Sequence, residues 1–223
     1  MITVADLIKD QPRSPGNYFA FDAYICGDYE SGLLENRQGD RLLALPETLI
    51  QGIYAALEKE TGQAHGVVLA NCGRWWGKNF YARFVEQVSE YYGKPLNEME
   101  MAEFSYCLKQ CWKTHGWGTC DLDLSYYQQG FLVVKTQNSP YAQQAPKGNR
   151  PVCHFEAGIL SAFFSQLTGR ELYCLQTTCE SLGAEYNHFV LGLASRLKPA
   201  DAWLEEQQEH EIIMHRLCNS SNQ

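Results

Sequence analysis

The feature that most limits how this chain can fold is the stretch from Pro151 to Leu191, where a long amphipathic segment runs directly into two short alternating segments. Apolar side chains recur at helical spacing from about Val152 to Thr168, which predicts a helix with one broad apolar face. The apolar positions are Phe155, Ile159, Leu160, Phe163, Phe164 and Leu167. Gly169 follows them, and a glycine there can close the last turn in the left-handed conformation.

Two strands are predicted after this helix. Residues 171–179 alternate like a strand. The side chains expected on one of its faces are Leu172, Cys174, Gln176 and Thr178. Gly183 marks a turn, and residues 185–191 resume a strand. The simplest arrangement is an antiparallel pair packed under the helix.

The motifs of this unit are a Pro-Val-Cys start at 151–153, Gly158 within the helix, a Leu-Thr-Gly end at 167–169 and the turn at Gly183. In these motifs the unit resembles the 4-vinyl reductase (V4R) domain. That domain is a small-molecule-binding module, also found in bacterial phenol-sensing activators and related in fold to subunits of the eukaryotic vesicle-tethering particle. The resemblance implies an α/β (α+β) fold, with helices packed on one face of an antiparallel sheet of about four strands. It also implies an apolar ligand pocket between the helical layer and the sheet.

Zinc-containing members of that family bind the metal through three cysteines and a glutamate. The resemblance places these ligands at Cys153, Gln176, Cys179 and Asn187, so only two thiols remain. A neutral amide oxygen is a poor substitute for a thiolate or a carboxylate on structural zinc. We therefore expect no zinc, with the thiols reduced and the two amides hydrogen-bonded, and the chain indicates no other cofactor.

Length and charge restrict the class of protein. With 223 residues at 45% hydrophobic composition, the chain predicts a single V4R-type ligand-binding domain over 1–223, with an N-terminal arm and a C-terminal helix. A formal charge of -8 and 18 scattered basic residues argue against a nucleic-acid partner. The nine cysteines fit a reducing compartment, and no apolar run reaches membrane-spanning length. These features predict a cytoplasmic protein. The photosynthetic role discussed below would add a location at the periphery of a photosynthetic membrane.

The N-terminal half predicts helices after a first segment whose structure the pattern leaves open. Residues 17–26 form either a first strand or an extended arm, and a polar loop over 27–40 follows. A helix is predicted from Pro46 to about Thr61, with Gly62 as its stop.

The longest predicted helix, from about 64 to 92, has an unusually aromatic surface. Gly73 and Gly77 either permit close approach of another helix or divide this segment. From the pattern alone, aromatic residues at helical spacing favour a packed core. The resemblance implies instead that some of them line a pocket. The predicted ligand-binding residues are Trp75, Trp76, Phe80, Phe84, Phe104, Trp112, Phe155, Ile159 and Phe163.

The next segments predict a helix and a hairpin. Asn97, with Glu100 three residues later, favours a capped helix that ends at the Gly-Trp-Gly of 116–118. Residues 121–136 predict a hairpin, and a polar loop over 141–150 follows it.

The last predicted helix, over 200–217, is either a surface helix that closes the core or a helix for a partner or a second copy. The residues after 218 are expected to fray.

No phosphate loop, nucleophile elbow or HExxH motif indicates an enzyme. Four residues near one helix end have side chains that can bind zinc. Their spacing matches no common zinc module, and buried cysteines ordinarily pack as small apolar residues. They are Cys107, Cys111, His115 and Cys120. His154 and His188 flank positions of the family motif, and we expect structural hydrogen bonds there.

The function predicted from the resemblance is binding of a hydrophobic small molecule, such as a tetrapyrrole or a lipid, by an accessory or photosystem-assembly factor. The alternatives are an enzyme that reduces a tetrapyrrole vinyl group, for which no electron-donor site is recognisable, and an interaction module with a filled core. The expected partners are a second copy of the chain in a homodimer and proteins of the photosystems or of pigment synthesis.

Overall fold

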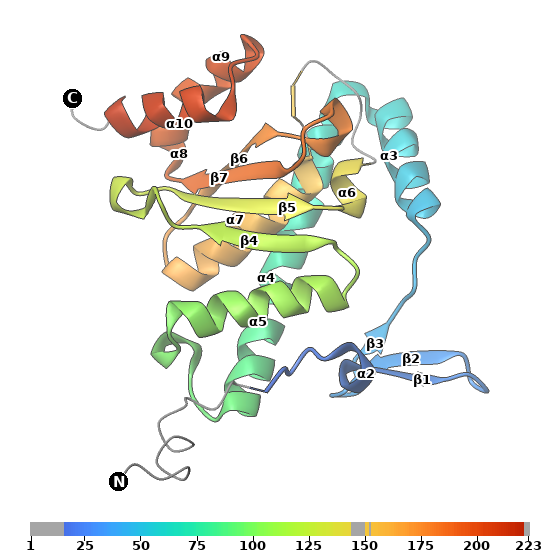
Figure 1. Cartoon of the computed structure of the whole chain (residues 1–223). Helices are drawn as coiled ribbons and strands as arrows, with labels where there is room; N and C mark the ends of the chain where they lie inside the picture. Colours follow the sequence, from blue (N-terminus) through green and yellow to red (C-terminus); the bar gives the residue numbers. More distant parts are fainter. Residues whose placement is uncertain (1–15, 144–149, 152, 221–223) are drawn as a thin grey trace, which may run out of the picture.

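A four-stranded antiparallel sheet in the order β4-β5-β7-β6 lies at the centre of the computed structural model, which describes residues 16–143, 150–151 and 153–220 (Figure 1). The strands are β4 (Thr119–Asp123), β5 (Leu132–Gln137), β6 (Tyr173–Thr178) and β7 (Asn187–Gly192). Both predicted hairpins, β4–β5 and β6–β7, are present, and β5 pairs with β7 to join them. A bulge between Gln176 and Thr178 interrupts the alternation that was predicted to continue along β6.

One face of this sheet is covered by the predicted helical layer. Its helices are α4 (His65–Tyr92), α5 (Met101–Thr114) and α7 (His154–Thr168). Val134 and Phe189 of the central strands face this layer and are fully buried in the main core. Gly169 ends α7 with a positive φ, as predicted.

Short helices cover the opposite face, which the sequence interpretation missed. They are α8 (Ala194–Leu197), α9 (Pro199–Glu205) and α10 (His210–Asn219). Val133 and Val190 point to this side and form a second core with Leu204 and Met214. The single helix predicted over 200–217 is wrong because the chain breaks between α9 and α10, where Gln207 takes a positive φ of 57°.

Helices α4 and α7 pack in parallel at unusually close range. A Cβ at Gly73 would lie 2.1 Å from the backbone oxygen of Phe155, and one at Gly77 would lie 2.5 Å from that of Ile159. The same holds for Gly158 of α7, where a Cβ would lie 2.4 Å from the backbone oxygen of Ala70. The helix is continuous through both of its glycines. Close approach, one of the two predicted roles for Gly73 and Gly77, is therefore confirmed.

The N-terminal segment differs from its prediction. Residues 17–26 are neither one continuous strand nor an extended arm: α2 (Phe21–Tyr24) is a single helical turn, and β1 (Ile25–Asp28) takes up only the last two of them. The predicted polar loop contains β2 (Leu33–Asn36), and β3 (Arg41–Leu42) completes a separate sheet in the order β1-β2-β3 (Figure 1). The backbone N–H groups of Ala23 and Tyr24 donate to the Ala20 oxygen to close this turn, and just before it Phe19 is buried in the main core with its backbone N–H donating to Asn17 Oδ1.

The remaining helices follow the prediction with shifted ends. Helix α3 (Glu47–Thr61) ends at Gly62, and a 3-10 turn η1 (Gly62–Ala64) leads into α4. The cap predicted at Asn97 is wrong, because η2 (Leu96–Glu98) is a separate turn. Glu100 and Glu103 form the capping box of α5.

Short helical turns replace some predicted loops and strand ends. They are η3 (Tyr127–Gln129), α6 (Pro140–Gln143) and η4 (Glu180–Leu182). The start of the N-terminal arm, most of the 141–150 loop, the predicted helix start at Val152 and the last three residues lie outside the described residues. In the part of the chain that is described, no helix combines the length and apolarity needed to cross a membrane.

Candidate functional site

Most of the predicted ligand-binding residues meet in one aromatic cluster of the main core. Those that are buried are Phe80, Phe84, Phe104, Trp112, Ile159 and Phe163. Trp76 and Phe155 are half-buried and pack against this core. Trp75 lies at the surface with 71% of its side chain exposed, so the structure does not bring it to the cluster. Successive residues of a helix point about 100° apart, so Trp75 and Trp76 cannot share one face.

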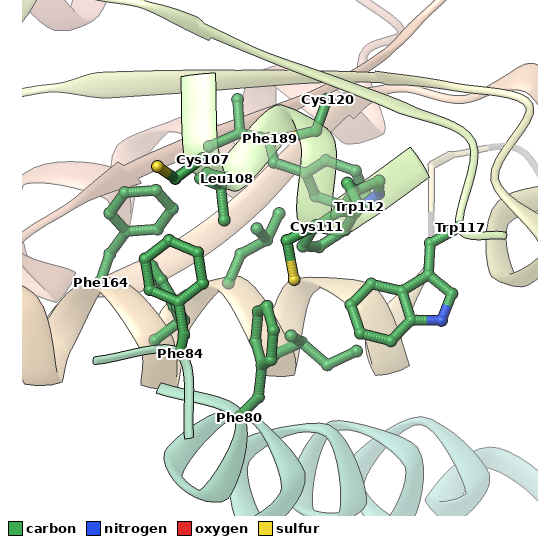
Figure 2. Packing of buried hydrophobic residues seen from close by; sticks show 14 of the residues in the cluster. Phe80, Phe84, Cys107, Leu108, Cys111, Trp112, Trp117, Cys120, Phe164 and Phe189 are labelled. Carbon is green, nitrogen blue, oxygen red and sulfur yellow. The ribbon is translucent and has the colours of Figure 1, made fainter. Parts of the chain in front are cut away.

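Ring-on-ring contacts fill much of the space between these residues (Figure 2). Phe80 is the centre: its ring centroid lies 5.3 Å from that of Trp76, 5.1 Å from that of Phe163 and 5.3 Å from that of Trp117. Trp117, the middle of the Gly-Trp-Gly motif, was not among the predicted ligand residues. Its position in that motif was the available signal.

A cleft of about 270 Å³ opens beside this cluster, between α4, the end of α5 and the small sheet. Trp76, Phe80 and Phe84 line it on the apolar side. Polar side chains border it as well, among them Asn79 and Arg83 of α4. An amphipathic cleft of this kind suits a small molecule that is mostly apolar and carries a few polar atoms.

His115 provides a hydrogen-bonding group at the wall of the cleft. Burial lowers the pKa of its imidazole, so the ring is neutral at pH 7. Its Nδ1 lies 2.8 Å from the backbone oxygen of Cys111 and donates to it, which leaves Nε2 as an acceptor 3.4 Å from the Tyr24 hydroxyl. The ring also stacks on Trp117 at 4.6 Å. This acceptor is therefore held in a fixed orientation.

Trp112 contributes a donor inside the cluster. It is 1% exposed, and its Nε1 has no hydrogen-bond partner among the described residues. Its ring lies 5.2 Å from that of Trp117 and 6.3 Å from that of Phe80, both of which line the cleft. An unpaired buried donor costs about 1 to 3 kcal/mol. An oxygen of a bound molecule would remove that cost.

The position of the family's zinc site holds a hydrogen-bonded network. Gln176 Oε1 accepts from the backbone N–H of Cys153 at 2.6 Å. Asn187 Oδ1 accepts from the backbone N–H of Glu180 at 2.8 Å, and its Nδ2 donates to the Glu180 carboxylate at 2.6 Å. The hydrogen-bonding role predicted for both amides is confirmed.

Glu156, which the sequence interpretation did not single out, is fully buried beside this network. The Ser139 hydroxyl donates to its Oε2 at 2.6 Å, and the Cys153 thiol lies 3.7 Å from the same oxygen. Burial raises the pKa of Glu156 to about 7. The signal was available, because a carboxylate at position 156 shares a helical face with Leu160 and Phe163.

This donor set does not suit structural zinc, since both amides are engaged by other groups and burial raises the pKa of the Cys153 thiol well above its ordinary value. Protein prepared without chelators is expected to contain well under one zinc per chain by elemental analysis. One zinc per chain, lost on Cys153→Ser but kept on Cys72→Ser, would contradict this expectation. Cys72 is an exposed cysteine on α4 and serves as the matched control.

The second candidate cluster is part of the core. Cys107, Cys111 and Cys120 are buried, and burial raises the pKa of each thiol. The described residues contain no group of three or more His, Cys, Asp or Glu arranged to hold a metal ion. Cys111 Sγ approaches His115 Nδ1 at 3.6 Å, so these side chains form a local contact in the wall of the aromatic cluster.

Comparison with known proteins supports the V4R resemblance over one segment and the fold over most of the chain. Residues 132–193 match the model of the V4R domain, from β5 to just beyond β7, which confirms the resemblance over that segment. The phenol-responsive sensory domain of the transcription activator PoxR, solved with phenol, is similar in structure with a TM-score of 0.63 at 12% identity. The match covers 86% of this chain and 96% of that domain. The α+β fold with a four-stranded antiparallel sheet is thus confirmed.

More distant similarities include a vinyl-4-reductase family protein from Methanocaldococcus jannaschii, with a TM-score of 0.45 at 18% identity over 67% of this chain and 82% of that one. Trafficking protein particle complex subunit 3 from Naegleria fowleri, solved covalently bound to palmitic acid, has a TM-score of 0.47 at 13% identity over 66% of this chain and 94% of that one. In sequence, the uncharacterized protein MJ1642 of M. jannaschii is 23% identical over 114 residues, which are 51% of this chain and 68% of that protein.

Proposed function

We propose that this chain is a small-molecule-binding domain of the V4R type, which takes up an apolar compound carrying at least one oxygen atom. The observation that carries the proposal is the buried indole N–H of Trp112, unpaired among the described residues and set in an aromatic cluster. The cleft lined by Phe80 and Trp117 opens beside that cluster, and Trp112 lies behind these two rings rather than in the cleft wall. A ligand hydroxyl at the wall would compete with the Tyr24 hydroxyl for His115 Nε2, the acceptor at that point of the cleft.

The similarity to a sensory domain that binds phenol supports the same ligand class, a small aromatic alcohol. Size gives independent support. Ligand pockets usually occupy about 300 to 1,000 Å³, and the cleft of about 270 Å³ lies just below that range. A compact ring fits this space, whereas a tetrapyrrole would require the aromatic cluster to open.

Further proposals about the ligand and the role rest on the sequence resemblance. A tetrapyrrole or a lipid is the alternative ligand, with a role as an accessory or photosystem-assembly factor. A vinyl-reducing enzyme and an interaction module with a filled core are alternative functions. We also propose one domain over the whole chain and a homodimer. The ring contacts around Phe80 favour the filled-core alternative, and the unpaired Trp112 donor favours a ligand.

Replacing Trp112 by Phe should weaken binding of phenol far more than binding of toluene. Phenol offers an oxygen to the indole N–H and toluene does not, so only phenol loses a hydrogen bond worth about 1 to 3 kcal/mol, which corresponds to about 5- to 150-fold in affinity. Isothermal titration calorimetry with both compounds measures the difference. Thermal unfolding in the absence of ligand shows whether the variant keeps its core.

Trp203→Phe is the matched control, since Trp203 packs against the second core on the other face of the sheet. It should leave both affinities unchanged. If wild-type protein binds neither compound, or if Trp112→Phe weakens phenol and toluene equally, the donor role of Trp112 is wrong. Absence of binding by any apolar probe would favour the interaction module.

A further inference from the structure

A second polar cleft lies at the end of the molecule where α4 and α7 begin. The two helices run in parallel, as the contacts of Gly73 with Phe155 and of Gly77 with Ile159 show, so their N-termini share one end. No side chain caps the N-terminus of α7. The positive ends of two helix dipoles therefore lie side by side, and each favours a negative charge there.

Two histidines and two arginines converge on the same place, and the positive charge comes from the arginines because burial lowers the pKa of His154. The His65 and His154 rings, at the first positions of α4 and α7, lie 6.2 Å apart. His154 fits against α4 because Gly66 has no side chain; a Cβ there would lie 2.6 Å from His154 Nε2. Arg74 and Arg150 also line this cleft, which measures about 640 Å³.

Three acidic groups lie near this cluster, and one of them, Glu156, is buried in the first turn of α7. Arg150 approaches the carboxylate of Glu205 at 3.7 Å, in a pair whose side chains are 45% and 71% exposed. Such an exposed pair is weak, because water and salt screen it. Asp201 lines an adjoining small cavity of about 70 Å³ that shares Arg150 and His154 with the cleft. A concentration of basic groups is unusual for a chain with a formal charge of -8.

An independent observation comes from Gln176, which lines that adjoining cavity. Gln176 is only 5% exposed, and while its Oε1 accepts from the Cys153 backbone, its Nε2 has no hydrogen-bond partner within the described part of the chain. A buried amide donor without an acceptor is destabilising unless something else supplies one. Its place beside the start of α7 makes an anionic oxygen the natural acceptor.

We propose that this cleft is a binding site for the oxyanion of a small molecule, either a carboxylate or a phosphate, distinct from the aromatic cluster. The backbone N–H groups at the start of α7 and the Arg74 and Arg150 side chains hold the charged oxygens, and the Gln176 amide donates from the adjoining small cavity. The rest of the molecule occupies the cleft along α4 and α7. Binding at this site does not require the phenol-type ligand.

The test is a titration of the full chain with inorganic phosphate and, separately, with acetate, followed by two-dimensional NMR of the backbone amides. Saturable shifts are expected at residues 154–156 and at Gln176 Nε2. Binding of phosphate alone identifies a phosphate site, binding of acetate alone a carboxylate site, and either result supports the proposal. Shifts that rise linearly without saturation, or that spread over the whole surface, would overturn it.

Two variants are expected to change the anion affinity in opposite directions. Arg74→Gln with Arg150→Gln should weaken the bound anion at least tenfold, whereas Asp201→Asn should tighten it severalfold because a neighbouring negative charge is removed. Lys113→Gln is the control, as it removes an exposed positive charge at the far end of α5. An equal loss in the control, or no response to either arginine or Asp201, would show general charge attraction and contradict a site. Phenol affinity should stay constant throughout, so failure here is separable from failure of the proposed aromatic site.

Discussion

Gly73→Ala is expected to destabilise the protein by at least about 3 kcal/mol, at the upper end of the range for overpacked sites. The new methyl group would lie 2.1 Å from the backbone oxygen of Phe155 and 3.1 Å from the backbone nitrogen of Ile159. Both atoms belong to the backbone of α7, so no side-chain rotation can relieve the clash. The two helices would have to separate, and the aromatic cluster that spans them would lose contacts.

Gly52→Ala provides the matched comparison on an exposed face of α3, where a Cβ would meet nothing within 4 Å. Without a clash, alanine should stabilise that helix by about 0.5 to 1 kcal/mol. Urea unfolding followed by circular dichroism measures both variants. Equal effects of the two substitutions would show that the glycine contacts between α4 and α7 are not tight in solution.

Glu156→Gln is expected to remove a stability loss of about 3 kcal/mol that the wild-type protein undergoes between pH 4.5 and 7. Burial raises the pKa of this carboxyl from 4.5 to about 7. The folded protein therefore keeps a proton that the unfolded chain releases. The contribution to stability is complete below pH 4.5, falls as the pH rises through 7 and is absent above that value. Glutamine stays neutral at every pH.

The measurement is the difference in unfolding free energy between wild type and Glu156→Gln at several pH values from 4.5 to 8. Four histidines have the opposite pH dependence, because burial lowers the pKa of each: His115, His154, His188 and His210. Their contributions cancel in the difference between the two proteins. Glu58→Gln, at an exposed position of α3, should give a flat difference. A flat difference for Glu156→Gln would mean that Glu156 is solvated.

Much of this fold could be predicted from sequence because local patterns decide it. The apolar periodicity of α7, its glycine end and both hairpins depend on residues within about twenty positions of one another. The small N-terminal sheet was missed because its strands are short, and its anchor, Phe19, is buried by residues far away in sequence. The second core was missed for a related reason. Val133 and Val134 point to opposite faces of the sheet, and their sequence is the same whether helices cover one of those faces or both.

The candidate sites also contain some residues that local spacing could select and others that it could not. Aromatic residues of α4 could be selected by their spacing, which placed Phe80 and Phe84 correctly in the main core but also admitted the exposed Trp75. The unpaired atoms of Trp112 and Gln176 could not be foreseen. Whether a buried donor finds an acceptor depends on the three-dimensional neighbourhood, and no periodicity records it.

The strand order also determines how the central sheet is assembled. Each hairpin, β4–β5 or β6–β7, closes a short connection and can form from neighbouring residues. The contact between β5 and β7 is different: Asn187 Nδ2 donates to the backbone oxygen of Thr136, 51 positions earlier in the chain. Closing that long connection carries the larger entropy cost, and α7 lies within it. The sheet is therefore two local hairpins joined by one non-local strand pair, β5–β7, and the Asn187 amide adds a side-chain hydrogen bond across that pair.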